Sequence, residues 1–518
     1  MKKVKVSPKN IKSFLKKVFT SKDFYFSLAL TVLNIFAVFW AAYYGRGISG
    51  KKFIILISLV VEIALLFGYH WAKRKHLSLE KIFLLLVIPL GLLFIAIMPC
   101  GQSPDETTHF YRIYGITEGY LIAPQSETNS GGTELPVEIE DVFHISPERG
   151  LYQSIAESLS AATSGEREDK NYVTAALYNP ICYLPQALGV LIGKLFGSSI
   201  LTQAYLARIF NFLGFVCLAY FAIKYMPKYR KFLLFIALFP ITLQEVTSLA
   251  PDALTIGLAF LLVAFVCHLT FAQKTPLTTR QYILLYALAS VIGFCKIVYL
   301  PLLLLYLIIP KERFGGKKAK LIHASIIVFM VLALNLAWFI ISSRYLVNVQ
   351  PGVSPSDQIR YLLTHPIHYL ATILATLNSQ ADFFAQGTFG MSLGHFAIAL
   401  PKIYFYPFFT FFILLLAQNT ERLPLKRFDR IVFAATALII LALVFTSLYI
   451  QWTPVANATV VGVQGRYFLP VLLLTPLILN SVKKPQAIHE GYISERQVVI
   501  FGIFSNVCAL ICILIANI

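Results

Sequence analysis

Residues 81–119 read KIFLLLVIPLGLLFIAIMPCGQSPDETTHFYRIYGITEG, an apolar run that gives way abruptly to a polar cluster. The run at 81–98 is close to the length that crosses a bilayer. The carboxylates of Asp105 and Glu106 follow it, and His109 comes one helical turn later. Because ionisable groups at a membrane boundary usually have a use, this stretch indicates both a membrane fold and a candidate functional site.

The composition of the whole chain agrees with a membrane fold. Of its 518 residues, 57% are hydrophobic and 13% are charged, whereas soluble domains carry about 25% charged residues. Apolar runs recur along nearly the whole length, so we expect one all-α integral membrane domain over residues 1–518. The thirteen expected spans are 24–45, 53–72, 81–98, 201–224, 232–249, 252–272, 281–296, 298–310, 321–342, 397–418, 431–450, 467–482 and 497–517.

The net charge of +19 indicates a topology, and no nucleic-acid partner is implied. We place 30 of the 44 Lys and Arg residues in short loops on one side, beginning with the basic N-terminus at 1–23. By contrast, 13 of the 25 Asp and Glu residues lie within residues 99–176. Since cytoplasmic loops carry the excess of Lys and Arg, we predict a cytoplasmic N-terminus and an outside C-terminus.

Three segments are expected at the outer face, namely 99–200, 343–395 and 451–466. Within the first, residues 176–197 are apolar enough for a span, but Pro180 and Pro185 interrupt them. Counting them as a span would invert every later loop. We therefore expect a juxtamembrane helix there.

The other candidate site residues fall at the outer ends of expected spans. Asp252 begins one span, with Glu245 a turn or two before it, and Lys296 occupies an outer turn. Arg466 directly precedes the span that starts at Tyr467. Carboxylates opposite cations suit a reaction in which a carboxylate deprotonates an acceptor hydroxyl and cations hold a departing phosphate.

Each candidate also has a structural alternative. Asp105 with Glu106, and likewise Asp252, could be ordinary charges at helix N-termini. Lys296 could extend its ammonium group to the membrane interface. Arg208, inside a span, needs a partner, for which a structural carboxylate would suffice.

Metal binding is not implied by the sequence. His365 and His368 are three residues apart, but a metal site there would need a third ligand that the sequence does not identify. No cofactor is expected, and a divalent metal is compatible with the chemistry without being required by it.

Two stretches resemble a known family. SPDETTHFYRIYGITEG at 103–119 and GVQGRYFLP at 462–470 resemble a bacterial family of polytopic membrane proteins of formerly unknown function within the GT-C glycosyltransferase superfamily. More broadly, the chain is similar to the protein O-mannosyltransferase and aminoarabinose-transferase branch. That branch has an acidic pair in the first outer loop and a later span with Arg, here Arg208. The likeness covers about 100–310 and 462–475.

The resemblance implies a GT-C-type fold and roles for individual residues. Asp105 would be the general base or acceptor-orienting carboxylate, Glu106 its partner and Asp252 a second carboxylate. Lys296 and Arg466 would contact the donor phosphate. The substrate-binding set also includes Tyr467, His109 and Arg208.

The expected function is transfer of a sugar, with inversion, from a polyprenyl-phosphate-linked donor to a surface glycan or lipid-linked acceptor. The reaction would take place at the extracytoplasmic face of the cell membrane, in contact with membrane lipid. One alternative is a transporter or flippase of lipid-linked glycans, although transporters often show two related halves and polar sites at mid-membrane. The other is a non-catalytic partner in envelope polysaccharide assembly.

Overall fold

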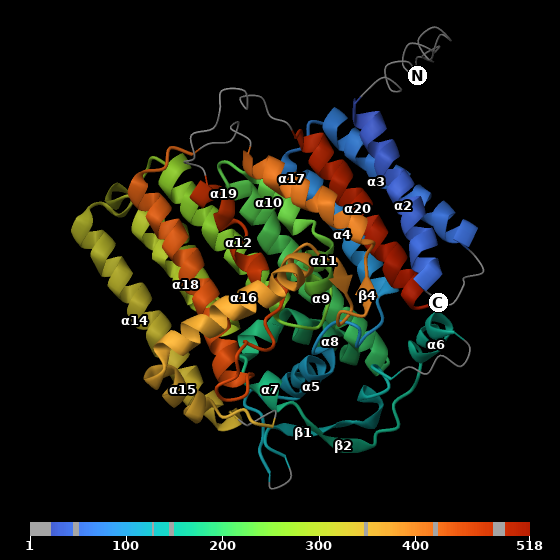
Figure 1. Cartoon of the computed structure of the whole chain (residues 1–518). Coiled ribbons are helices and arrows are strands. Elements are labelled where there is room, and N and C mark those ends of the chain that lie inside the picture. Colours follow the sequence, from blue (N-terminus) through green and yellow to red (C-terminus); the bar gives the residue numbers. More distant parts are fainter. Residues whose placement is uncertain are drawn as a thin grey trace.

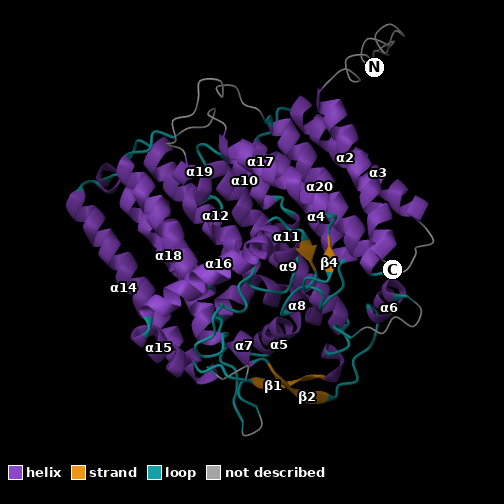
Figure 2. Ribbon diagram, in the orientation of Figure 1, coloured by secondary structure: helices purple, strands orange, loops and turns teal. Residues whose placement is uncertain are grey.

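Helices make up most of this computed structural model, which describes residues 22–44, 51–126, 129–144, 150–346, 351–417, 423–479 and 493–518. The long helices lie side by side in a bundle (Figure 1). The described part of the chain also contains two short antiparallel hairpins (Figure 2). The expectation of a mostly helical membrane protein is confirmed, whereas a purely α-helical chain is not. The expected cytoplasmic segment 1–23 lies almost wholly outside the described residues.

Seven helices of the described residues are long and apolar enough to cross a membrane. They are α3 (Lys51–Arg74), α4 (Leu79–Ile97), α9 (Ile200–Tyr225), α12 (Asp252–Cys267, continued by the π-helical η3, His268–Ala272), α14 (Lys317–Ser342), α18 (Arg427–Gln451) and α20 (Glu495–Ala516). Shorter apolar segments include most of α2 (Lys22–Tyr44). The expected total of thirteen spans is therefore not confirmed.

Proline explains where the described helices depart from the expected spans. The stretch 232–249 forms two short helices, α10 (Arg230–Ala237) and α11 (Pro240–Val246). Pro240 lacks the backbone N–H that a continuous helix would need, yet it fits the first turn of a new helix. Likewise 397–418 begins as a strand and a 3₁₀ turn around Pro401 before α17 (Phe405–Ala417) starts. Pro470 lies in the 3₁₀ helix η8 (Gly465–Val471), which is followed by the short α19 (Leu474–Leu479).

The expected break at Lys296 is present. Helix α13 (Thr279–Cys295) ends there, and the 3₁₀ helix η4 (Ile297–Ile308) follows. Lys296 itself has an extended backbone, with φ −155° and ψ 116°. At ~2 Å per residue a 3₁₀ helix of this length extends roughly 24 Å, more than an α-helix of equal length.

The expected first outer segment gathers at one end of the bundle (Figure 1). It contains α5 (Glu106–Thr117), η1 (Val137–Ile139), α6 (Leu151–Ser158), α7 (Val173–Ala176), η2 (Pro180–Tyr183) and α8 (Leu184–Leu195). Strands β1 (Gly132–Pro136) and β2 (Arg167–Asn171) pair antiparallel, with Gly132 opposite Asn171. At ~1.5 Å per residue α8 is too short to cross a bilayer, which fits the expected juxtamembrane helix.

A close approach fixes α8 against α9. A Cβ atom added at Gly189 would lie 2.5 Å from the carbonyl oxygen of Leu206. Only glycine therefore allows this contact. Helix α8 also packs against α5. It therefore holds α5, which begins with the polar residues Glu106 and His109, near the N-terminal half of α9.

The expected second outer segment forms two helices and the first strand of a hairpin. Helix α15 (Pro355–Thr364) begins after the N-cap Ser354, and α16 (Pro366–Thr388) continues past the break at His365. Helix α16 crosses obliquely over the bundle (Figure 1). At its end a Cβ added at Gly465 would lie 2.3 Å from the Thr388 nitrogen, so glycine lets η8 touch α16. Strands β3 (Ser392–Leu393) and β4 (Ile398–Ala399) follow.

A buried polar contact joins α2 and α3 to the rest of the bundle. The Asn34 amide donates to Glu62 Oε1 at 2.5 Å and to the Phe504 carbonyl of α20 at 3.1 Å. The Tyr404 hydroxyl donates to Asn34 Oδ1. Polar groups inside a membrane are costly unless paired, so this network holds the N-terminal helices in one arrangement.

Candidate active site

The start of α5 directs two adjacent carboxylates differently. Asp105, the N-cap, has a left-handed backbone with φ 64°, a conformation that Asp and Asn tolerate better than most residues. Its side chain is 63% exposed. Glu106 is the first helical residue, and its side chain is 0% exposed. The pair therefore does not form one site in which both carboxylates face a substrate.

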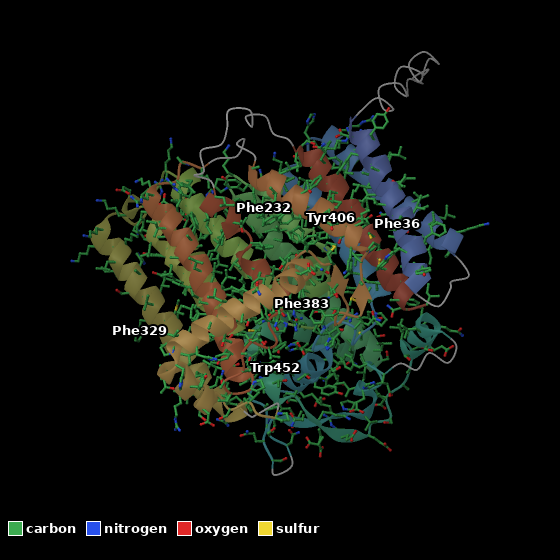
Figure 3. The ribbon with its side chains drawn as sticks, viewed as in Figure 1. Phe36, Phe232, Phe329, Phe383, Tyr406 and Trp452 are labelled. Atoms are coloured by element: carbon green, nitrogen blue, oxygen red, sulfur yellow. The ribbon has the colours of Figure 1, made fainter. Side chains whose placement is uncertain are left out.

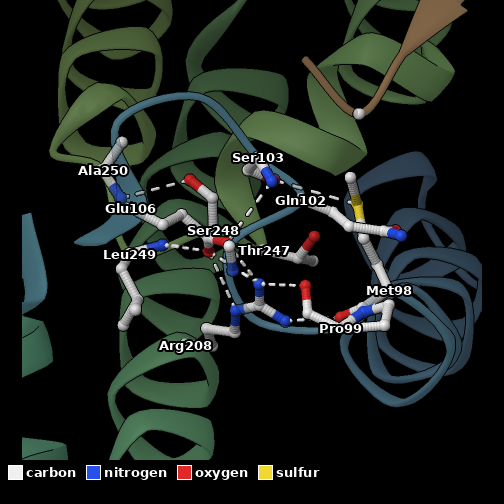
Figure 4. A network of polar contacts seen from close by, with 12 residues as sticks. Met98, Pro99, Gln102, Ser103, Glu106, Arg208, Thr247, Ser248, Leu249 and Ala250 are labelled. Atoms are coloured by element: carbon white, nitrogen blue, oxygen red, sulfur yellow. Dashed lines mark hydrogen bonds and ion pairs between the residues drawn. The ribbon is translucent and has the colours of Figure 1, made fainter. Parts of the chain in front are cut away.

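Glu106 lies in a buried network with Arg208 (Figure 4). Arg208 donates from Nη2 to both carboxylate oxygens, at 2.7 and 2.6 Å, and from Nε at 3.0 Å. The backbone nitrogens of Gly101 and Leu249 donate to the same carboxylate at 2.8 and 3.1 Å. Arg208 also donates to the Met98 carbonyl at 2.6 Å. The network ties α5 to α9 and to the segments after α4 and before α12.

Glu106 is thus the carboxylate partner that Arg208 needs inside the bundle. The Arg208 side chain is 1% exposed and its donors face protein acceptors, so it offers little to a substrate. The position of Glu106 is that of a structural anchor. Its role as a chemical partner of Asp105 stays a prediction.

Arg466 connects two carboxylates from different parts of the chain. Its Nη2 lies 3.3 Å from Asp105 Oδ2, and its Nη1 lies 3.0 Å from Glu245 Oε2 on α11. Arg466 and Glu245 are buried, whereas Asp105 is open to solvent. Arg466 therefore holds the exposed carboxylate at the edge of a buried ion pair.

A second ion pair lies beside the first. Lys296 Nζ is 2.6 Å from Asp252 Oδ1. The same ammonium group is 5.0 Å from the centre of the Tyr467 ring, and Arg466 Cζ is 5.4 Å from that ring. Both cations thus contact one aromatic ring, which is a favourable cation–π arrangement. We call Asp105, Glu245, Asp252, Lys296 and Arg466 the charged cluster.

His109 lies behind the charged cluster as a neutral group. Its Nδ1 is 2.7 Å from the Tyr183 hydroxyl, and its ring is 5.5 Å from that of Tyr178, edge to face. Burial lowers the pKa of the His109 imidazole to about 4, and this outweighs the opposing effect of Asp105 and Asp252. At neutral pH His109 is therefore a hydrogen-bonding group and adds no positive charge.

A cavity of about 380 Å³ begins at Lys296. It lies between the end of α13, the start of η4, α14 and α18. Its polar residues include Lys296, Tyr178 and Tyr467, and its apolar lining includes Phe294, Ile297, Val298, Trp338, Phe339, Leu346, Val444 and Leu448. Many side chains of α14 are exposed, so this helix lies at the surface of the bundle, where lipid is expected. Helix α14 also forms one wall of this apolar groove.

Metal ligands do not gather within the described residues, where no group of three His, Cys, Asp or Glu side chains could hold an ion. His365 and His368 instead contact Tyr361. The His365 ring stacks on Tyr361 at 4.5 Å, and His368 Nδ1 lies 3.2 Å from its hydroxyl.

The structure brings together four of the residues that the sequence singles out and adds neighbours that the sequence does not mark. Asp105, Asp252, Lys296 and Arg466 all belong to the charged cluster. The sequence does offer a signal for Glu245, because a lone carboxylate in an apolar stretch usually has a function. Tyr178 and Tyr183 had no spacing that marked them.

The structure thus defines an integral membrane protein with charged residues converging next to an apolar groove. Residues 87–475 match the family described as predicted membrane protein (DUF2142), and the chain belongs to this family. That description names no activity. No curated protein and no solved structure matches the chain.

Proposed function

We propose that this protein is a membrane glycosyltransferase of GT-C type. It would transfer a sugar, with inversion, from a polyprenyl-phosphate-linked donor to a cell-envelope glycan at the extracytoplasmic face. The observation that carries the proposal is the position of Lys296, paired with Asp252 at 2.6 Å, at the polar end of the apolar groove. An amphiphilic donor with an anionic phosphate and a long apolar chain has the same two parts.

The groove supplies a site for each part of the donor. Lys296 uses one N–H toward Asp252, so two remain for phosphate oxygens. Trp338, Phe339 and Val444 offer an apolar surface that suits prenyl units. The donor would approach laterally along α14 without leaving the membrane.

Charge pairing singles out Asp105 as the base. The charged cluster contains three carboxylates and two cations. Lys296 neutralises Asp252, and the buried contact of Arg466 neutralises Glu245. Asp105, exposed and held by the longer contact of 3.3 Å, is the carboxylate in excess.

The reaction follows from this arrangement. The acceptor hydroxyl oxygen attacks the anomeric carbon while its proton passes to Asp105. The bond between the anomeric carbon and the phosphate oxygen breaks, and its electron pair leaves with the lipid phosphate. Lys296 stabilises the developing charge on that oxygen. Attack opposite the leaving group inverts the anomeric configuration.

The test is Asp105→Asn in purified protein with a synthetic polyprenyl-phosphate sugar. Asn keeps the size of the side chain and tolerates the left-handed backbone, but it accepts no proton. We expect about 10²–10⁴-fold slower transfer with nearly unchanged donor binding, as for loss of a general base. Asp141→Asn, an exposed carboxylate in the same outer segment, is the matched control. Normal turnover by Asp105→Asn would refute this mechanism.

A further inference from the structure

A second, smaller cavity adjoins Arg466 and shares no lining residue with the apolar groove. Its volume is about 10 Å³, which is room for one group the size of a water molecule or a hydroxyl. Its walls come from five places in the chain: Pro104 before α5, Glu245 on α11, Gly387 near the end of α16, Gln464 beside Arg466, and the β3–β4 hairpin. Arg466 lines this cavity and Tyr467, the next residue, lines the groove.

Two buried polar atoms of the lining residues have no hydrogen-bond partner within the described residues. They are Arg466 Nε, a donor, and Gln464 Oε1, an acceptor. Buried polar atoms normally have partners, so an unpaired donor and acceptor beside one cavity point to a ligand. A hydroxyl group accepts one hydrogen bond and donates another, and so complements both atoms.

Two exposed phenylalanine rings, those of Phe396 and Phe383, lie together here, and Phe396 lines the cavity. His395 and Phe396 on the β3–β4 hairpin have consecutive left-handed backbones, with φ 53° and 66°. The Phe396 ring, on a residue 43% exposed, lies 5.3 Å from that of Phe383 on α16, which is 40% exposed. Backbone strain of this kind clusters at active sites and ligand-binding sites.

Polar side chains on α16 accompany these rings. Asp382, next to Phe383, accepts a hydrogen bond from Gln386 Nε2 at 2.5 Å. Both belong to the turn of α16 that carries Phe383, and Asp382 is exposed. A carboxylate and an amide beside aromatic rings can bond sugar hydroxyls while the rings cover the apolar C–H face of a pyranose.

We propose that Phe383 and Phe396, with Asp382 and Gln386, bind a pyranose ring of a saccharide acceptor and direct one hydroxyl into the small cavity at Arg466. This inference rests on the proposed function for the word acceptor, but saccharide binding itself does not require transfer. A purely apolar occupant would leave Arg466 Nε and Gln464 Oε1 unpaired, which argues against a lipid chain at this place.

The experiment measures saccharide binding without transfer. Purified protein in nanodiscs is mixed with oligosaccharides released by mild acid from the envelope of the source cells, and binding is followed by saturation-transfer NMR. Phe383→Ala and Phe396→Ala should each weaken binding about tenfold, as truncation of a central aromatic contact typically does. The matched control is Phe329→Ala on α14, which is 76% exposed and lies on a different part of the bundle (Figure 3).

The outcomes of the binding experiment distinguish a failure of the saccharide site from a failure of the proposed function. Loss of binding in both variants, but not in Phe329→Ala, supports the saccharide site whether or not the protein transfers sugar. Unchanged binding in both variants, or no saccharide binding by the wild type, overturns the inference even if sugar transfer is observed. Repeating the titration with lipid-linked oligosaccharide shows whether the acceptor is free or membrane-anchored, since tighter binding of the lipid-linked form indicates the latter.

Discussion

Replacing Glu106 by Gln tests whether this residue anchors the fold or takes part in chemistry. In the structure its carboxylate accepts three hydrogen bonds from Arg208 and further ones from backbone N–H groups, all shielded from solvent. Gln removes the negative charge and turns one acceptor into a donor that faces Arg208. Removing one partner of a buried ion pair typically costs about 3–5 kcal/mol, which is a large share of the roughly 5–15 kcal/mol that stabilises a protein.

The assay is equilibrium unfolding in mixed micelles with increasing SDS, followed by tryptophan fluorescence. Glu168→Gln is the control, because Glu168 pairs with Lys170 at 2.6 Å but its side chain is 62% exposed. Exposed pairs contribute about 1 kcal/mol or less, so this variant should unfold almost as the wild type does. If Glu106→Gln were as stable as the control while its transfer rate collapsed, Glu106 would be a chemical group and the anchoring role would be refuted.

Three further predictions concern the site, its stability and the topology. Arg466→Ala should impair donor use far more than Arg466→Lys, which keeps the charge but not both ion pairs; equal kinetics for Arg466→Ala and the wild type would remove it from the site. Burial lowers the pKa of His109 to about 4 from about 6.5, so the unfolded chain binds more protons between these values. Stability should therefore fall as the pH drops through this window, and unfolding curves of His109→Gln should show a smaller fall. Cysteines introduced at Glu138 and Lys228 should be labelled from outside and inside, respectively, and labelling of both from one side would refute the topology.

The mostly helical membrane character of the chain, and the position of the charged residues at helix ends, could be predicted because both follow from local sequence. Apolar runs mark the helices, and span ends on one side of a membrane lie at one level, so Asp105, Asp252 and Arg466 were expected in the same region. Which charge pairs with which could not be predicted. Arg466 and Asp105 are separated by 361 positions, and their contact depends on how η8 packs against α11, α12 and α16.

The differences between the expected and the observed structure have physical causes. Average hydropathy marks 232–249 as a span but is blind to Pro240, which divides it into α10 and α11. The polar segments GTELP at 132–136 and REDKN at 167–171 lack the apolar alternation of a strand, so their pairing needed the three-dimensional context. The sequence makes Glu106 the partner of Asp105, whereas in the structure the Glu106 carboxylate pairs with Arg208, because one helical step turns a side chain by about 100°.

The contact between Asn34 and Glu62 also bears on how the chain is made. Residues 87–475 carry the family match, and α2 and α3 precede this range, so they are synthesised before it. Tyr404, which completes the contact, lies 370 residues after Asn34. At about 5–20 residues per second its synthesis follows by roughly 20–70 s. Until then the partners of Glu62 are the ones that α2 supplies, Asn34 and Thr31, and these hydrogen bonds can join α2 to α3 while the rest of the bundle is translated.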